Sequence, residues 1–195
     1  SSESDLADIL SPFAAKITEL FPDWLLKLRV LVDHPIPVDQ RGALENTQEN
    51  ISAHYDLSNE MFAAFLDDSL SYSSAMFDPT RPLQEQDLYE AQLRKVNAVL
   101  DLAGVKDGDE VLEIGTGWGT LAIEAARRCA PVTTGTLSVE QADLARTRIE
   151  DAGFSDRVEV LVLDYRLVQG EFDAVVSVEM IEAVGEQYWP DYFKT

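Results

Sequence analysis

The segment at residues 111–119 constrains the fold of this chain more than any other stretch. Residues 111–114 have the sequence Val-Leu-Glu-Ile, and glycines follow at Gly115, Gly117 and Gly119. Branched apolar residues favour a strand, while glycines allow a sharp turn and let a ligand lie against the main chain. The segment therefore predicts a strand that runs through a glycine-rich turn into a helix. The acidic Glu113 favours a nucleoside ligand whose facing end is positive or neutral.

Two common nucleotide-binding motifs do not fit this spacing. A dinucleotide site has G-x-G-x-x-G, and a P-loop ends in Gly-Lys-Ser or Gly-Lys-Thr. In this chain the third glycine comes two residues after the second, and the turn contains no lysine. The remaining pattern, E-x-G-x-G-x-G, resembles the first motif of S-adenosylmethionine (SAM) methyltransferases. The glycines alone leave open an ordinary tight turn between a strand and a helix.

Apolar periodicity predicts alternating strands and helices around this turn. We expect strands at residues 110–114, 132–137, 158–163 and 172–178. We expect helices at residues 59–67, 83–103, 120–129, 139–152 and 186–193. Strands that alternate with helices predict parallel pairing in an α/β, doubly wound sheet.

The N-terminal residues 1–49 are predicted to form a helical extension and linker. Apolar residues recur at helical spacing over residues 6–31, and residues 33–50 are polar. The segment 24–31 is apolar with two basic residues. It either packs on the main domain or contacts a partner or a bilayer.

The composition narrows the function classes. The 195 residues include 15 Lys and Arg against 36 Asp and Glu, a net charge of −21, which argues against nonspecific nucleic-acid binding. The single cysteine, Cys129, rules out an internal disulfide framework, and its predicted helical context favours a buried structural thiol. No apolar run is long enough to span a membrane, and no signal peptide is evident. These features predict a cytoplasmic protein.

Ligands of an open parallel sheet bind at the carboxyl ends of its strands. Asp164, after the third predicted strand, is expected to accept a hydrogen bond from an adenine amino group, with Tyr165 against the ring. Thr136, at the end of the second strand, is expected to hydrogen-bond ribose hydroxyls. Glu179 follows the fourth predicted strand. It is either a residue of the site or an ordinary surface carboxylate, with equal weight.

The chain resembles the cyclopropane fatty acid synthase and mycolic acid cyclopropane synthase family of SAM-dependent methyltransferases. Four stretches in the family's order carry the resemblance over about residues 50–195. They are His-Tyr-Asp-Leu-Ser-Asn from His54, Tyr-Ser-Ser-Ala from Tyr72, the glycine motif, and the strand ends up to Met-Ile-Glu-Ala-Val-Gly at 180–185.

The resemblance implies a Rossmann-like class I methyltransferase fold with an N-terminal helical cap. The cap is expected over the cofactor at residues 50–103, and the SAM-binding domain at 104–195. This fold normally has seven strands, whereas four are predicted here. We therefore expect the C-terminal strands of the sheet to be missing from these 195 residues.

The resemblance also assigns site residues. Contacts to SAM are implied for Tyr72, Ser73, Gly115, Gly117, Thr136, Leu137 and Gln141. With the strand-end residues Glu113, Asp164 and Tyr165, these make up the predicted cofactor site. The family uses a bound bicarbonate ion as the general base, which implies catalytic roles for Glu182 and for the backbone of Ser74. Ser74 replaces the family's cysteine, and Ala183 stands where a histidine often follows the glutamate. No metal site is expected.

The implied reaction is SAM-dependent transfer of a methyl or methylene group to the double bond of an unsaturated fatty acyl chain, carried by a phospholipid. The product would be a cyclopropane or a methyl- or methylene-branched chain. Peripheral contact with the inner face of the membrane is expected, and homo-oligomerisation is left open. The alternatives are a SAM methyltransferase for a small polar acceptor and a non-catalytic SAM-binding scaffold subunit.

Overall fold

Four parallel strands form the centre of the structure, a computed structural model that describes residues 59–195. These residues all belong to one compact unit of the chain. The predicted extension at residues 1–49 lies outside the described residues. So does the first family stretch, which begins at His54, except for its last residue, Asn59.

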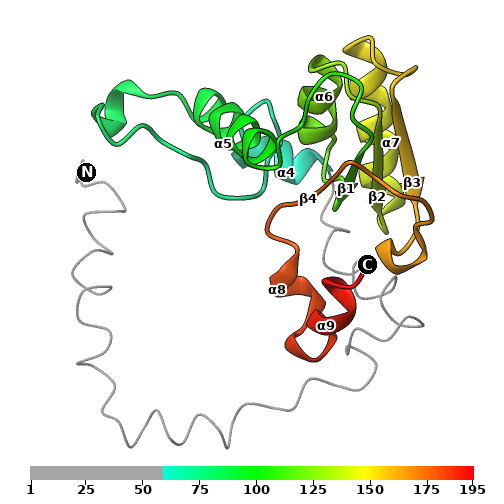
Figure 1. Ribbon diagram of the computed structural model, residues 1–195. Helices are drawn as coiled ribbons and strands as arrows, with labels where there is room; N and C mark the ends of the chain where they lie inside the picture. Colours follow the sequence, from blue (N-terminus) through cyan, green and yellow to red (C-terminus); the bar gives the residue numbers. More distant parts are fainter. Residues whose placement is uncertain (1–58) are drawn as a thin grey trace, which may run out of the picture. The chain divides into compact units, whose positions relative to one another are not determined.

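The sheet has the order β3-β2-β1-β4, with every neighbouring pair parallel (Figure 1). Its strands are β1 (Val111–Ile114), β2 (Val132–Thr136), β3 (Val158–Val162) and β4 (Ala174–Ser177). All four strands lie where the sequence predicts them, and each is shorter than expected by one to three residues. Because β1 is central, the glycine turn that follows it opens at the middle of the sheet's carboxyl edge.

The helices flank these strands in sequence. They are α4 (Asn59–Phe65), α5 (Leu88–Leu102), α6 (Thr120–Arg127), α7 (Val139–Asp151), α8 (Ile181–Val184) and α9 (Trp189–Tyr192). Short 3-10 helices lie at Leu83–Glu85, Tyr165–Leu167 and Glu186–Tyr188. Within the described residues, no helix has the length and apolar character needed to cross a membrane.

Two helix predictions are wrong in their bounds. The predicted helix at 83–103 is divided, because the side chain of Asp87 accepts a hydrogen bond from the Glu90 amide and caps the start of α5. The predicted helix at 186–193 is a 3-10 turn followed by α9, and the short α8 before it was not predicted. Gly185, with a φ of +82°, separates α8 from the 3-10 turn.

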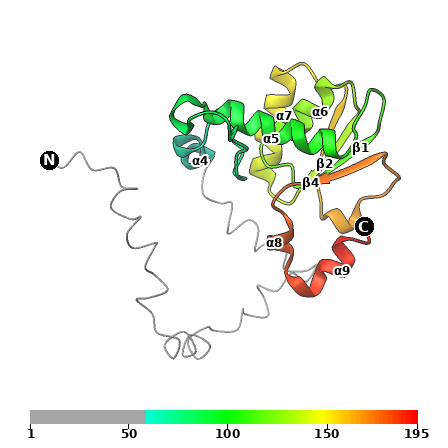
Figure 2. The same cartoon turned by 60° about the vertical axis from the view of Figure 1, so that its left-hand side comes forward.

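Both faces of the sheet are covered around β1. On one face Val111 packs with Leu100 of α5 and Leu121 of α6. On the other face Leu112 and Ile114 pack with side chains of the C-terminal segment, namely Val184, Tyr188 and Tyr192. Figure 2 shows that α8 and α9 lie apart from α6 and α7. The burial of β1 on both faces explains why its sequence is almost continuously apolar.

The prediction of a buried thiol is wrong. Cys129 is exposed and has a φ of +65°. The reason is that α6 ends at Arg127, so Cys129 lies in the turn after the helix and not within it. A cysteine one turn earlier would have been carried on the buried face of α6.

Candidate active site

The glycine turn at residues 115–119 lines the candidate site. Gly115, Gly117 and Gly119 have φ values of +94°, +51° and +87°, in the left-handed region where a Cβ is strained. A Cβ added at Gly117 would meet no atom of the described residues within 4 Å, so the main chain there faces open space. At Gly119 it would lie 3.3 Å from the Cβ of Ala145, so this glycine permits close packing of α6 on α7. The turn therefore suits a ligand beside Gly117.

Glu113 lies beneath this turn with its side chain buried. Thr134 Oγ1 donates to its carboxyl at 2.6 Å and lies 2.8 Å from Thr116 Oγ1. Burial raises the pKa of Glu113 to about 8, against the smaller opposing effect of the Thr134 hydrogen bond. The carboxyl is therefore predominantly protonated at neutral pH, and the three side chains form a buried chain of hydrogen bonds. A positive ligand group nearby would favour its ionised form.

The structure brings together two residues predicted at the second strand. Thr136 Oγ1 donates to Gln141 Oε1 at 2.9 Å, and both side chains are buried. The amide of Ser138 donates to Thr136 Oγ1, and the Ser138 side chain accepts from the Gln141 amide to cap α7. Leu137 lies between β2 and this cap. The second strand end is thus a rigid polar corner.

Asp164 at the third strand end is buried and paired, not solvated. Arg166 donates through Nε to one carboxylate oxygen at 2.8 Å and through a terminal nitrogen to the other at 2.5 Å. Burial opposes the charge, but hydrogen bonds from the Arg166 side chain and amide hold the pKa of Asp164 below its ordinary value. Tyr165 is buried, and its ring packs edge-on against Tyr192 at a centroid distance of 5.3 Å.

Residues 71–74 are held by polar side chains of α5. Gln92 Nε2 donates to the carbonyls of Ser71 and Ser73, at 3.2 and 2.8 Å. Lys95 Nζ donates to Ser73 Oγ. Tyr72 remains exposed, with its ring edge-on to Phe62 of α4 at 5.3 Å. The predicted SAM contacts Tyr72 and Ser73 therefore have a fixed backbone.

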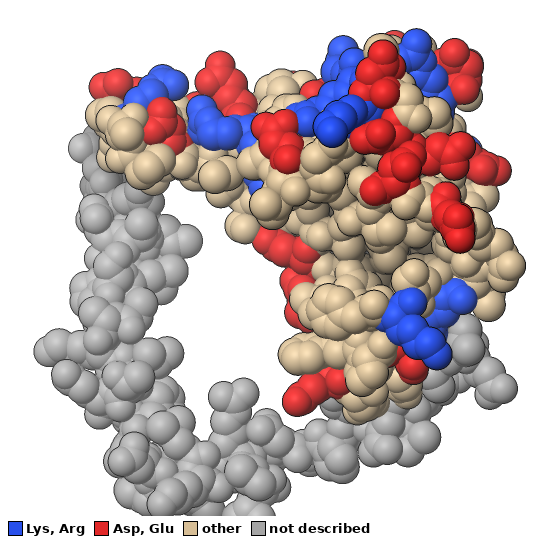
Figure 3. All heavy atoms as spheres, in the orientation of Figure 1, with Lys and Arg blue, Asp and Glu red and all other residues tan. Residues whose placement is uncertain are grey.

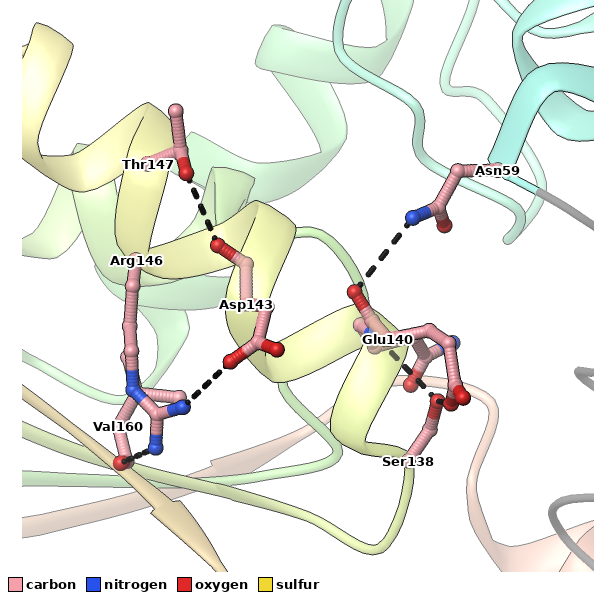
Figure 4. A network of polar contacts seen from close by, with 8 residues as sticks. Asn59, Ser138, Glu140, Asp143, Arg146, Thr147 and Val160 are labelled. Carbon is pink, nitrogen blue, oxygen red and sulfur yellow. Dashed lines mark hydrogen bonds and ion pairs between the residues drawn. The ribbon is translucent and has the colours of Figure 1, made fainter.

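The segment before Tyr72 is anchored on the glycine turn. Arg148 of α7 donates to the carbonyls of Asp68, Ser69 and Trp118, at 3.0, 3.0 and 2.7 Å. The Trp118 indole donates to Asn59 Oδ1 at 2.8 Å. Figure 4 shows the Asn59 amide directed at the start of α7, where it meets a backbone carbonyl at 3.5 Å. These contacts fix the described part of the predicted cap on the sheet.

Ser74 is joined to the end of β4 by Glu179. The amide and hydroxyl of Ser74 both donate to Glu179 Oε1, at 2.8 and 2.7 Å. These hydrogen bonds, together with the charge of Lys95, hold the pKa of Glu179 below its ordinary value. Glu179 has a φ of +49°, which a residue with a Cβ adopts only at a cost of about 1–2 kcal/mol. Glu179 is therefore a strained carboxylate in a fixed position.

Glu182 does not join this contact. It is exposed on α8 and, within residues 59–195, makes no hydrogen bond or ion pair. The backbone amide of Ser74, which the family resemblance assigns to bicarbonate, donates instead to Glu179, as does the Ser74 hydroxyl. The residues predicted to bind bicarbonate do not fit that ion as the structure places them.

Several site residues were missed or undervalued at the sequence level. The sequence alone leaves Glu179 as an even choice between a site residue and a surface carboxylate, and it predicts no site role for Lys95 or Gln92. Arg148 carried no signal, because its partners are backbone carbonyls about 30 and 80 residues away. The one usable signal for Glu179 was its place two residues after β4, at the edge of the sheet where ligands bind.

A separate hollow of about 290 Å³ lies at the opposite, amino edge of the sheet. Its lining includes Pro131, Arg157 and Phe172. Ligands of open parallel sheets bind at the carboxyl edge, so this hollow is not the candidate site.

The sequence model of mycolic acid cyclopropane synthetase matches residues 43–195. The chain is 49% identical over 197 residues to tuberculostearic acid methyltransferase UfaA1 of Mycobacterium tuberculosis, covering 98% of this chain and 46% of that protein. It is 36% identical over 141 residues to cyclopropane-fatty-acyl-phospholipid synthase of Escherichia coli, covering 72% of this chain and 35% of that protein. The chain thus spans less than half the length of these relatives.

A solved structure of mycolic acid cyclopropane synthase CmaA1, complexed with SAH and CTAB, superposes with a TM-score of 0.69 at 29% identity. The match covers 75% of this chain and 50% of that one. The predicted class I methyltransferase fold is confirmed. Because the family's sequence model matches more than half of this chain, the chain belongs to the mycolic acid cyclopropane synthetase family.

Proposed function

We propose that this protein transfers a methyl group from SAM to the double bond of an unsaturated fatty acyl chain carried by a phospholipid. The observation that carries the proposal is the convergence of the predicted SAM residues at one sheet edge. The open glycine turn, the Thr136–Gln141 corner and the Asp164–Arg166 pair follow β1, β2 and β3 in turn. Family membership and the similarity to UfaA1 support the acyl acceptor.

SAM supplies an electrophilic methyl group, so the protein's task is to place it. The backbone at Gly115 and Gly117 would lie against the cofactor, with Tyr72 and Ser73 above it. Thr136 and Gln141 would bind the ribose, and Asp164 and Tyr165 the adenine. An alkene needs no base to become a nucleophile, so positioning is the main contribution to methyl transfer.

We also propose that the protein takes its substrate from the surface of a membrane. Large apolar side chains are exposed over residues 61–77, namely Met61, Phe65, Met76 and Phe77. They adjoin the segment that would cover the cofactor. On the face drawn in Figure 3, acidic and basic side chains alternate along the upper edge. Apolar insertion therefore accounts for membrane contact better than attraction between opposite charges.

Binding of SAM tests the first half of the proposal. Equilibrium dialysis with the full-length protein should show binding, and Gly117→Ala should weaken it at least tenfold because the added methyl group enters the open space. Gly153→Ala is the matched control. Gly153 also has a positive φ with no neighbouring atom among the described residues, but it lies in the turn after α7. Equal losses in both variants would contradict the assigned site.

Transfer of the methyl group to lipid tests the second half of the proposal. The full-length protein would be incubated with methyl-labelled SAM and vesicles of monounsaturated phospholipid, and the lipids hydrolysed. We expect label in the fatty acid fraction. Label in the head group or in a polar small molecule would favour the alternative acceptor, whereas SAM binding without transfer to any acceptor would favour the scaffold subunit.

A further inference from the structure

The proposed function, on which this inference rests, requires a base after methyl transfer. Attack of the alkene on the methyl group leaves a carbocation, and a proton must leave before the product is stable. We propose that Glu179 is this base: its carboxylate, held on Ser74, accepts the proton in place of a bound bicarbonate ion.

Few acidic side chains of the described residues lie at the carboxyl ends of the strands and could act as this base. Glu113 is buried and bonded within its threonine chain. Asp164 is paired on both oxygens with Arg166. Glu182 is exposed and makes no polar contact that would fix it. Glu179 combines a position fixed by two hydrogen bonds from Ser74 with solvent access through which a proton can later depart.

The placement of Glu179 suits this role. Its partner Ser74 directly follows Tyr72 and Ser73, the residues predicted to contact SAM. Lys95 both donates to Ser73 and supports the negative charge of Glu179. The left-handed backbone at Glu179 turns the chain just after β4, and the structure maintains this strain where a strand ends at the site.

The step requires no oxidant or reductant. The methyl carbon bonds to one alkene carbon while its bond to sulfur breaks, and sulfur keeps that electron pair. The other alkene carbon becomes cationic. A neighbouring C–H bond then breaks, and its pair forms either a new double bond or a three-membered ring. The proton goes to the Glu179 carboxylate and then to water.

A carboxylate near a carbocation can also form an ester, and the Ser74 contacts oppose this. Two hydrogen bonds on Oε1 stabilise its charge and hold the group in place, which reduces its reach and nucleophilicity. The same two donors would otherwise be available to a bound anion. The protein's own carboxylate thus occupies the anion position.

Removal of bicarbonate separates the two possible bases. Wild-type full-length protein would be assayed for transfer to phospholipid in CO2-depleted buffer and with added bicarbonate, and we expect rates within twofold. Glu179→Gln keeps an oxygen for Ser74 but is not basic, so turnover should fall by about 100-fold or more. Its affinity for SAM should stay within threefold, which shows that the site is folded.

Glu179→Gly gives an independent readout. Glycine relaxes the positive φ and leaves the Ser74 donors open, so added bicarbonate or formate should restore turnover in this variant in a concentration-dependent way. Glu159→Gln, at an exposed position of β3, is the control for loss of one charge. The inference is overturned if wild-type turnover collapses without bicarbonate, or if Glu179→Gln keeps more than half of it while Glu182→Gln does not. Absence of wild-type transfer in both buffers would instead overturn the proposed function.

Discussion

The buried carboxyl of Glu113 should make the stability of this protein depend on pH. Its pKa is raised from 4.5 to about 8, mainly by burial. Below pH 4.5 both folded and unfolded chains hold the proton, and the residue has no effect. As pH rises toward 8 only the unfolded chain ionises, so the folded state is progressively destabilised. At about 1.4 kcal/mol per pKa unit, the full penalty above pH 8 is ~5 kcal/mol.

Glu113→Gln should remove this penalty, because glutamine is uncharged and keeps an oxygen acceptor for Thr134. We would measure the free energy of unfolding by urea titration at pH 5, 7 and 9. The free energy of unfolding of the variant should rise relative to that of the wild type as pH rises, by ~4 kcal/mol between pH 5 and 9. Glu159→Gln, which removes an exposed carboxylate, should show no comparable trend. A difference between Glu113→Gln and wild type that stays constant with pH would refute the reasoning.

Two further substitutions test the packing around the turn. Gly119→Ala should lower the free energy of unfolding by ~1–3 kcal/mol more than Gly153→Ala, since both have positive φ but only the first meets Ala145, and equal losses would contradict this. Arg148→Met removes three hydrogen bonds to carbonyls and should cost ~2–3 kcal/mol and speed proteolysis at residues 66–71. Arg127→Met, which loses one ion pair with Glu124 and a cation–π contact with Phe154 but no bond to residues 66–71, is its control, and equal protease sensitivity would argue against the anchor.

The central part of the fold was predictable because its signals are local. Apolar runs broken by turn residues gave the four strands, and the spacing of Gly115, Gly117 and Gly119 gave the turn and the start of α6. Parallel pairing followed from the alternation of strands with helices. Helix ends were less predictable, since a capping side chain such as Asp87 competes with apolar periodicity over a few residues.

The polar contacts of the site were beyond prediction from sequence because they join distant segments. Ser74 and Glu179 are 105 positions apart. Neither the left-handed backbone of Glu179 nor the burial of Glu113 follows from residue type, because both depend on tertiary packing. The family resemblance directed the catalytic role to Glu182, whereas the structure places Glu179 on Ser74. The SAM contacts themselves remain predictions.

The strand order also shapes how this chain can fold during synthesis. β1 pairs on one side with β2, which follows after about 20 residues, but its other neighbour, β4, pairs at a separation of 63 residues. At about 5–20 residues per second, a ribosome needs several seconds to supply that second partner. Throughout that interval the most buried strand of the sheet has an unpaired edge, the kind of surface that pairs with other chains. The nascent chain is therefore most prone to aggregation between the synthesis of β2 and that of β4.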